Sequence, residues 1–198
     1  MKQALSARIL CRMKSLLCRL IQWPRIALYR AISSGEIVNN GAKFHQPVLI
    51  TGRGRVVLGR CNLGVWPSPF FFSGYIHLKA REPTAEIVIE DGVYINNNTA
   101  LVAEQTRIRL GRNTLLGTEV TIYDSDFHHI DPELRLSNQR ITQPVDIGSN
   151  VFIGSRCIVL KGTTVGDDCV IGAGSIVSGK FPARSLIAGV PAKVCKDI

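Results

Sequence analysis

The stretch that decides the fold is I-G-S-N-V-F-I-G-S-R-C-I-V-L-K-G-T-T-V-G-D-D-C-V-I-G-A-G-S-I, residues 147–176. It divides into hexads that each begin with Ile or Val, and Gly follows that residue in all but one of them. The fifth position always holds a small residue or Val. A period of six fits neither the 3.6-residue turn of an α-helix nor the period of two in a long strand. It indicates a short strand and a corner, with one aliphatic side chain pointing inward per hexad and Gly supplying an unusual backbone angle.

The repeat predicts a solenoid in which three hexads close one triangular coil and neighbouring coils stabilise one another. Two earlier coils keep the same spacing of inward aliphatic residues: Ile89, Ile95, Leu101, Leu110, Leu116 and Ile122. The face that holds Leu110 recurs at Ile147 and not at residue 128. We therefore expect a loop to leave the solenoid over 124–146, with His128 at its root.

Several segments resemble a known family, the hexapeptide-repeat acyltransferases. V-D-I-G-S-N-V-F-I-G, G-A-G-S-I-V and I-A-G-V-P-A-K-V, within 145–194, resemble its acetyl-CoA-binding end. Y-I-N-N-N-T (94–99) and D-S-D-F-H-H-I-D-P-E-L-R (124–135) resemble its acceptor region and catalytic loop. The similarity is greatest to the maltose, galactoside and polysaccharide O-acetyltransferase branch.

This resemblance implies an all-β fold, a left-handed parallel β-helix with an N-terminal amphipathic helix and a protruding catalytic loop. It also implies an acetyl-CoA-dependent O-acetyltransferase that needs no metal, working as a homotrimer with its active site between subunits. We divide the chain into a basic helical segment (1–34), a degenerate start of the solenoid (35–84) and the acetyltransferase domain (85–198).

Acetyl transfer from a thioester to a hydroxyl requires a base, donors for the developing oxyanion and alignment of both substrates. Histidine suits the role of base because its ordinary pKa leaves it mostly neutral at pH 7. Of the four histidines, His45 and His77 lie where the repeat is degenerate. The family pattern, a histidine followed within a few residues by an acid and an arginine, selects His128 and leaves His129 as the weaker candidate.

Four polar residues are candidates for acceptor binding. Asp124 and Asp126 flank the histidine, where one of them orients the imidazole or binds acceptor hydroxyls, or both are turn residues. Asn96 and Asn98 match an asparagine pair near the acceptor pocket of the family, and the alternative is an asparagine ladder that stabilises turns. Glu104 and Glu119 remain alternative carboxylates.

On the donor side, the resemblance places the pantetheine arm in a groove between two subunits, where backbone amides hold it. The matching small residues are Gly154, Ser155, Ala173 and Gly174, for which a turn role is the alternative. Arg184 and Lys193 are candidates to meet the CoA phosphates, with a solvated surface charge as the alternative. Pro191 belongs to a terminal motif at the adenine end.

The N-terminal segment contributes most of the positive charge. Residues 1–34 hold seven of the 24 basic side chains and no acid, whereas the remainder holds 17 basic and 15 acidic ones. An apolar stripe at helical spacing is formed by Leu5, Ile9, Met13, Leu16 and Leu20. We expect Pro24 to break this helix. A basic amphipathic helix suits an anionic membrane surface, so residues 1–23 are a candidate for peripheral membrane contact, and docking on the trimer is the alternative.

We expect the protein to be cytoplasmic. Peripheral attachment to the inner membrane is a further alternative that the N-terminal segment raises. No apolar run approaches 18 residues, and basic residues interrupt the first apolar stretch, so neither a transmembrane helix nor a cleaved signal peptide is expected. Cys157 and Cys169 occupy the small-residue slot of the repeat, which favours a reducing compartment. The body shows no basic stripe interleaved with aromatics, so we expect no nucleic-acid partner.

The acceptor that we expect is a sugar hydroxyl in bacterial surface polysaccharide biosynthesis (O-antigen, capsule or exopolysaccharide). The alternatives are another small acceptor such as an antibiotic, serine or an amino sugar, a zinc-dependent γ-class carbonic-anhydrase-like enzyme, and a non-catalytic solenoid. The carbonic anhydrase requires three converging histidines, which the spacing of the four does not favour.

Overall fold

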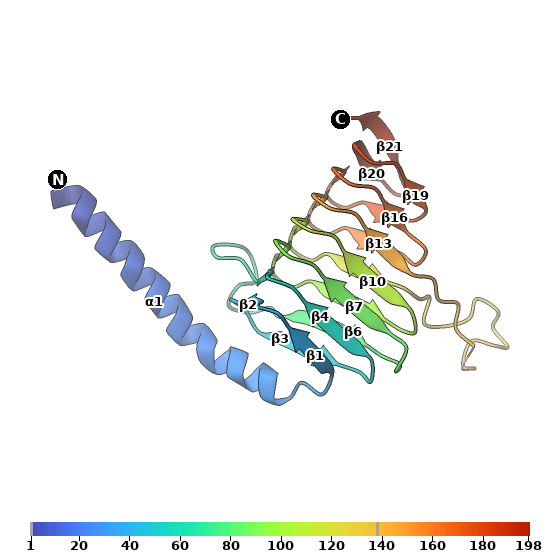
Figure 1. Ribbon diagram of the computed structural model, residues 1–198, viewed down its shortest axis with the longest axis horizontal. Coiled ribbons are helices and arrows are strands. Elements are labelled where there is room, and N and C mark those ends of the chain that lie inside the picture. Colours follow the sequence, from blue (N-terminus) through green and yellow to red (C-terminus); the bar gives the residue numbers. More distant parts are fainter. Residues whose placement is uncertain (1, 138) are drawn as a thin grey trace.

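The computed structural model describes residues 2–137 and 139–198, and side chains from residue 16 onward within those ranges. One long helix precedes a stack of parallel β-strands that takes up the rest of the chain (Figure 1). The strands form three sheets, here called A, B and C, which the chain visits in that order again and again. Each set of three consecutive strands is therefore one triangular coil, as the hexads predict.

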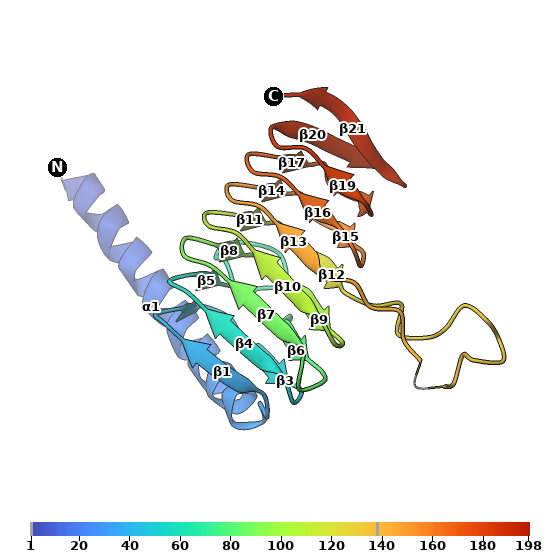
Figure 2. The same cartoon turned by 45° about the vertical axis from the view of Figure 1, so that its right-hand side comes forward.

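Sheet A contains β1 (Glu36–Asn39), β4 (Arg55–Leu58), β7 (Glu86–Ile89), β10 (Arg107–Leu110), β13 (Val145–Ile147), β16 (Thr164–Val165) and β19 (Lys180–Phe181). Sheet B contains β2 (Lys43–Phe44), β5 (Asn62–Leu63), β8 (Tyr94–Ile95), β11 (Leu115–Leu116), β14 (Phe152–Ile153), β17 (Val170–Ile171), β20 (Ser185–Gly189) and β21 (Ala192–Asp197). Sheet C contains β3 (Val48–Thr51), β6 (Ile76–Ala80), β9 (Ala100–Ala103), β12 (Thr121–Tyr123), β15 (Ile158–Val159) and β18 (Ile176–Val177). Figure 2 shows the strands of successive coils lying above one another.

The core is a column of aliphatic side chains inside the coils. Ile153 of β14 lies in register between Leu116 of β11 and Ile171 of β17, and each points inward. Ile147 and Val159, which open the neighbouring hexads, are equally inaccessible to solvent. Because each short strand buries one inward residue against the coils above and below, the stack holds together through nearest-neighbour contacts.

The small-residue slot of the repeat also lies inside the stack. Cys157 and Cys169 are buried and unpaired, and their thiols donate to the carbonyl oxygens of Gly172 and Pro182 at 3.1 Å. Cys61 is likewise buried, and desolvation raises the pKa of its thiol to about 11. These thiols act as small core residues.

The solenoid starts well before the clear hexads. Residues 36–80, where the repeat decays, form β1–β6, which pair in parallel within the same three sheets. Val56, Leu63 and Leu78 supply their inward positions and are fully buried. The strands here are mostly longer, and residues 65–75 leave the coil between β5 and β6, which disrupts the six-residue spacing.

The helix α1 (Lys2–Ala31) continues through Pro24, so the prediction that this proline breaks the helix is wrong. A proline inside a helix costs about 3 kcal/mol or more. Contacts on both sides of it offset this cost: Arg25 donates to the Gly74 carbonyl at 2.9 Å, and Gln22 donates to the Phe71 carbonyl. The second half of α1 packs near β3, whereas the first half projects away from the solenoid (Figures 1 and 2).

The side chains of Leu5, Ile9 and Met13, which belong to the predicted apolar stripe, lie outside the described residues. Leu16 and Leu20, the remaining members, are exposed to solvent. Within residues 2–137 and 139–198, no helix has the length and apolarity needed to cross a bilayer.

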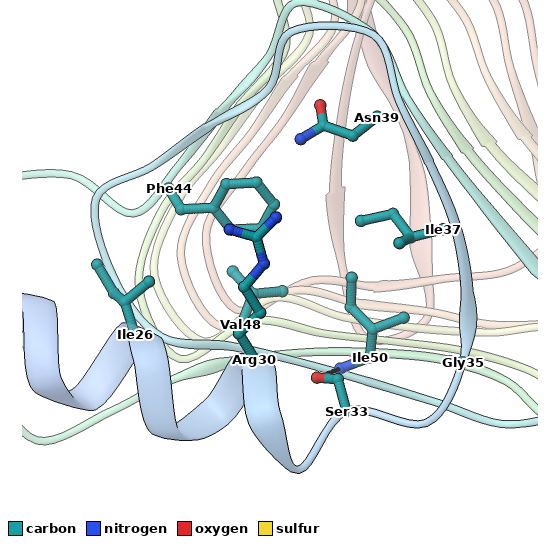
Figure 3. A pocket seen from close by; sticks show the side chains of 9 residues that line it. All are labelled: Ile26, Arg30, Ser33, Gly35, Ile37, Asn39, Phe44, Val48 and Ile50. Carbon is teal, nitrogen blue, oxygen red and sulfur yellow. Dashed lines mark hydrogen bonds between the residues drawn. The ribbon is translucent and has the colours of Figure 1, made fainter.

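The two ends of the solenoid differ. At the C-terminal end, β21 turns back and pairs antiparallel with β20. At the N-terminal end, a pocket of about 330 Å³ opens into the first coil, and Figure 3 shows Ile37, Phe44 and Ile50 around this space. Arg30 comes in from α1 at one side. The first coil therefore exposes part of its inward apolar face.

Replacing an inward residue tests the core. We expect Ile153→Ala to lower the free energy of unfolding by about 2–5 kcal/mol, because the cavity left inside the stack cannot be refilled by its short strands. Chemical denaturation measures the change. Thr164→Ala, at an exposed outward position, is the control and should shift the free energy of unfolding by less than about 0.5 kcal/mol. Equal losses in both variants would contradict the inward packing of Ile153.

Candidate active site

The turns that join sheet B to sheet C form one edge of the triangular stack, here called the BC edge. Asn98, Glu119, Arg156 and Gly174 occupy equivalent positions in successive turns, with positive φ of 59°, 59°, 61° and 74°. Each turn bonds to the next: Glu119 N–H donates to the Asn97 carbonyl at 3.1 Å, and the bond repeats from Arg156 to Thr118 and from Gly174 to Ser155 at 2.9 Å. This regular edge collects residues from distant parts of the sequence into one column.

A groove of about 530 Å³, here called the edge groove, lies along the BC edge. It is lined by Pro69, Phe70, Thr118, Glu119, Ser155, Arg156, Ala173 and Gly174. Three of the residues predicted for the donor, Ser155, Ala173 and Gly174, thus lie together on one wall. The fourth, Gly154, is buried just behind them.

Close packing between successive turns also requires glycine at some positions of this wall. A Cβ on Gly154 would lie 2.5 Å from the backbone N of Ala173, and one on Gly117 would lie 2.6 Å from that of Ser155. By contrast, a Cβ on Gly174 would meet nothing within 4 Å. Within the described residues, the N–H groups of Ser155 and Ala173 donate to no other group. The groove therefore offers an open surface with spare backbone donors.

The other wall is the loop 65–75, which Asn97 holds in place. The buried Asn97 side chain accepts a hydrogen bond from Val65 N–H at 3.0 Å and donates to the carbonyls of Val65 (3.0 Å) and Pro69 (2.9 Å). The family resemblance points to its neighbours Asn96 and Asn98, and nothing in a run of three asparagines marks the middle one for this role.

The two predicted acceptor asparagines differ in exposure. Asn98 is exposed on the BC edge. The Asn96 side chain is half-buried, accepts a hydrogen bond from Asn97 N–H at 2.8 Å and approaches the Ser68 hydroxyl at 3.4 Å. Asn98 therefore has the freer side chain.

His128 lies on a different edge, the CA edge, where turns join sheet C to sheet A. Strand β12 ends at Tyr123 and strand β13 begins at Val145. The chain between these two residues leaves the stack as the predicted loop. The exposed His128 ring approaches the Arg135 carbonyl oxygen with Nδ1 at 3.1 Å. Because a carbonyl only accepts, Nδ1 carries the proton, and the lone pair of Nε2 is left for a substrate.

His129 is arranged the other way round. Its Nδ1 accepts a hydrogen bond from Asp131 N–H at 3.1 Å, so the proton of the neutral ring sits on Nε2. Its basic nitrogen is therefore occupied within the loop. Of the remaining histidines, His45 pairs with Asn62 at 3.1 Å, and burial lowers the pKa of His77.

The two predicted aspartates have different surroundings. Asp124 is fully buried, and its carboxylate accepts from Glu104 N–H at 2.6 Å and from the N–H and hydroxyl of Thr106 at 2.8 Å. These bonds fasten the root of the loop to the turn below. Asp126 is exposed and pairs with Lys161 at 2.9 Å. Neither carboxylate bonds to the ring of His128 among the described contacts.

The alternative carboxylates are also paired. Buried Glu104 lies between Arg81 (3.0 Å) and Arg140, a residue of the loop itself. Glu119 pairs with Arg156 at 3.0 Å on the BC edge. Within the described part of the chain, no group of three or more potential metal ligands comes together.

The three C-terminal residues predicted for the cofactor are all exposed, and they divide between two edges. Pro191 and Lys193 lie at or beside the β20–β21 turn, above the BC edge, where Gly189 N–H donates to the Ser175 hydroxyl at 3.2 Å. Arg184 lies between β19 and β20, on the edge that joins sheet A to sheet B. One chain therefore brings Pro191 and Lys193, but not Arg184, to the edge of the groove.

One chain also keeps His128 apart from the groove. The edge groove lies on the BC edge, the histidine loop leaves the CA edge, and the whole of sheet C lies between them. Figure 1 shows the loop 65–75 (teal) and the loop that carries His128 (tan) on opposite sides of the stack.

Comparisons with known proteins agree with this architecture. Residues 144–178 match the family model "Hexapeptide repeat of succinyl-transferase". The chain is 33% identical over 144 residues to "Putative acetyltransferase YJL218W" of Saccharomyces cerevisiae, covering 73% of this chain and 68% of that protein. The chain belongs to the hexapeptide-repeat acetyltransferase family.

Other family members differ in extent. The chain is 38% identical over 114 residues to galactoside O-acetyltransferase of Escherichia coli, covering 58% of this chain and 55% of that protein. It thus spans about half to two thirds of the length of the curated relatives it matches. The hexapeptide-repeat acetyltransferase VCA0836 of Vibrio cholerae superposes with a TM-score of 0.59 at 23% identity, over 96% of this chain and 91% of that one. This likeness confirms the predicted fold, a left-handed parallel β-helix.

Proposed function

We propose that this protein transfers an acetyl group from acetyl-CoA to a sugar hydroxyl, with His128 as the general base. The observation that carries the proposal is the hydrogen bond between His128 Nδ1 and the Arg135 carbonyl, which leaves the lone pair on Nε2, for which no partner is described. The family relatives named as galactoside and lipopolysaccharide O-acetyltransferases support the reaction class.

The donor would occupy the edge groove. Acetyl-CoA supplies an acetyl group activated as a thioester. The residues fit such a guest: small side chains at Ala173 and Gly174 leave room for a narrow arm, and the N–H groups of Ser155 and Ala173 have no partner among the residues that the structure describes. Lys193, exposed at the end of the same edge, would meet the phosphates.

His128 would act twice in one turnover. Its Nε2 removes the proton of the acceptor hydroxyl as that oxygen attacks the thioester carbonyl carbon. The imidazolium that results returns the proton to the sulfur as the C–S bond breaks. The Arg135 carbonyl keeps the ring oriented and stabilises its charged form throughout, so no metal is required.

We propose that the working enzyme is a homotrimer in which the histidine loop of one chain reaches the edge groove of the next. This arrangement follows from the separation of the two edges, and it turns sheet C toward the threefold axis. Sheet C suits that position from β9 to β18, because an uncharged ladder of outward side chains runs along that part: Ala100, Thr121, Ile158 and Ile176. The outward charge of Lys79 lies below it, on β6. Sheet A instead carries ion pairs, with Arg109 at 2.8 Å from both Glu90 and Asp146.

The acceptor that we propose is a sugar of a surface polysaccharide or of its lipid-linked precursor, which places the enzyme in the cytoplasm at the inner membrane. Exposed apolar residues on the outer face of α1, among them Leu17, Leu20 and Ile21, support this placement. So does the excess of basic residues in 1–34, where no acid is present.

Changing His128 tests the chemistry. We expect His128→Ala to reduce acetyl transfer roughly 100- to 10,000-fold, because the acceptor hydroxyl loses its base. Thiol release from acetyl-CoA with a panel of galactosides, serine and amino sugars measures the rate and identifies the acceptor class. His129→Ala is the matched control and should retain most of the activity. Both variants should still bind CoA, and equal activity of His128→Ala and wild type would overturn the assignment.

Mixing two inactive variants tests the shared site. His128→Ala keeps an intact groove, and Ala173→Trp keeps an intact histidine while filling the groove. If each site takes its histidine and groove from different chains, co-expression should restore about a quarter of the wild-type activity by random assembly. A site built within one chain would give no recovery.

Vesicle sedimentation tests the membrane contact. We expect the full chain to sediment with phosphatidylglycerol vesicles and not with phosphatidylcholine vesicles, because the segment is basic and apolar. Leu17→Asp should abolish sedimentation, whereas Leu136→Asp, at a still more exposed leucine on the histidine loop, should leave it unchanged. Equal binding to both lipids would contradict the electrostatic part of the proposal.

A further inference from the structure

A second groove, here called the helix groove, lies between α1, sheet B and the loop 65–75. Its volume is about 750 Å³, within the range of ligand-binding clefts. Three aromatic side chains that line it remain open to solvent: Trp23 of α1 (71% exposed), Trp66 of the loop (48%) and Tyr94 of β8 (46%). Large aromatic rings left exposed in a cleft offer flat apolar surfaces to a ligand.

The charges that line the helix groove all have one sign. Arg19 and Lys43 are exposed there beside His45, and no acidic residue is among the lining side chains. Within the described residues, neither Arg19 nor Lys43 forms an ion pair. A cleft with free cations and no acid attracts an anionic ligand.

The helix groove lies next to the candidate active site, on the other side of the loop 65–75. The loop 65–75 separates the two grooves: Trp66 and Phe71 face the helix groove, whereas Pro69 and Phe70 line the edge groove. Gln22 and Arg25 of α1 bond to carbonyls of this loop, so the helix and the loop are held together. A chain-like ligand lying in the helix groove would therefore pass over the loop 65–75 to reach the edge where the reaction is proposed.

We infer that the helix groove binds an extended, negatively charged glycan, of which one sugar reaches the edge groove as the acetyl acceptor. This inference rests on the proposed function and adds the class of acceptor: an acidic polymer instead of a free neutral sugar. The apolar faces of sugar rings pack on Trp23, Trp66 and Tyr94. Carboxylates or phosphates of the chain meet Arg19 and Lys43.

Two other occupants fit less well. A second copy of this chain would bring its own basic α1 segment to a groove whose charges are also positive. The two sets of like charges would repel each other. A single-stranded nucleic acid also combines bases that stack with a charged backbone, but the aromatics lie on three separate elements around one cleft and form no continuous track.

Calorimetric titration of the full chain tests the inference, with decagalacturonate as the acidic probe and maltodecaose as its neutral counterpart. We expect decagalacturonate to bind and maltodecaose and monomeric galacturonate to bind at least about tenfold more weakly, because they lack the charges or the length. Trp23→Ala and Lys43→Gln should each weaken decagalacturonate binding by about tenfold. Arg112→Gln, an exposed arginine away from the groove, is the control and should bind as wild type does.

The outcomes separate this inference from the proposed function. No binding of decagalacturonate, equal binding of the neutral decamer, or unchanged binding by Trp23→Ala and Lys43→Gln would overturn it, even if small galactosides are acetylated. Tighter binding of a decameric single-stranded DNA, or loss of the oligomer in Trp23→Ala by light scattering, would also overturn it. Binding of the acidic decamer without any acetyl transfer would refute the reaction alone. Thermal melts confirm that each variant is folded.

Discussion

The stacking of inward aliphatic side chains from coil to coil constrains everything else in this protein. A strand of two residues buries only one side chain, as Ile153 shows, and its backbone hydrogen bonds go to the neighbouring coils. No coil can be stable alone, so each must repeat the geometry of the one beneath it. The turns are consequently superposed as well, and a residue in one turn lies beside its equivalents in the next.

This constraint determines where chemistry can be placed. An extra residue inside a strand would break the register of the whole stack, whereas an insertion at a corner leaves it intact. Both long insertions obey this rule, since residues 65–75 leave at the BC edge and the histidine loop leaves at the CA edge. The superposed turns supply the rigid wall of the groove, and the loops supply the side chains that the repeat has no room for.

The sequence predicted the parts that the repeat controls. The hexads of 147–176 predicted the triangular coils, and the wide gap before Ile147 predicted the loop. Both could be read from the sequence because every coil needs an aliphatic residue at the same inward positions. Ser155, Ala173 and Gly174 were grouped by the family resemblance, and the stacked turns bring them together on one wall. Where a single contact decides, the pattern carried no information: nothing local distinguishes the anchoring Asn97 from its two neighbours.

Other features depend on contacts across long sequence distances. The helix continues through Pro24, and Gln22 and Arg25 beside it bond to a loop about 50 residues away, which no local pattern reveals. The bonds from the turn below to Asp124 come from residues that no motif links to it. The tautomer of a histidine cannot be predicted from the sequence either. The tautomer of His128 depends on the path of the loop, which brings the Arg135 carbonyl next to Nδ1.

The open N-terminal end gives the stack a direction. A terminal coil is in contact with one neighbour only, and here its inward residues Ile37 and Phe44 lie beside a pocket, whereas a hairpin covers the opposite end. In a one-dimensional array, local opening starts at the terminus with the weakest interface and spreads inward. We therefore expect amide protection to be graded along the axis, lowest near β1 and β2 and highest in the middle coils that form the edge groove.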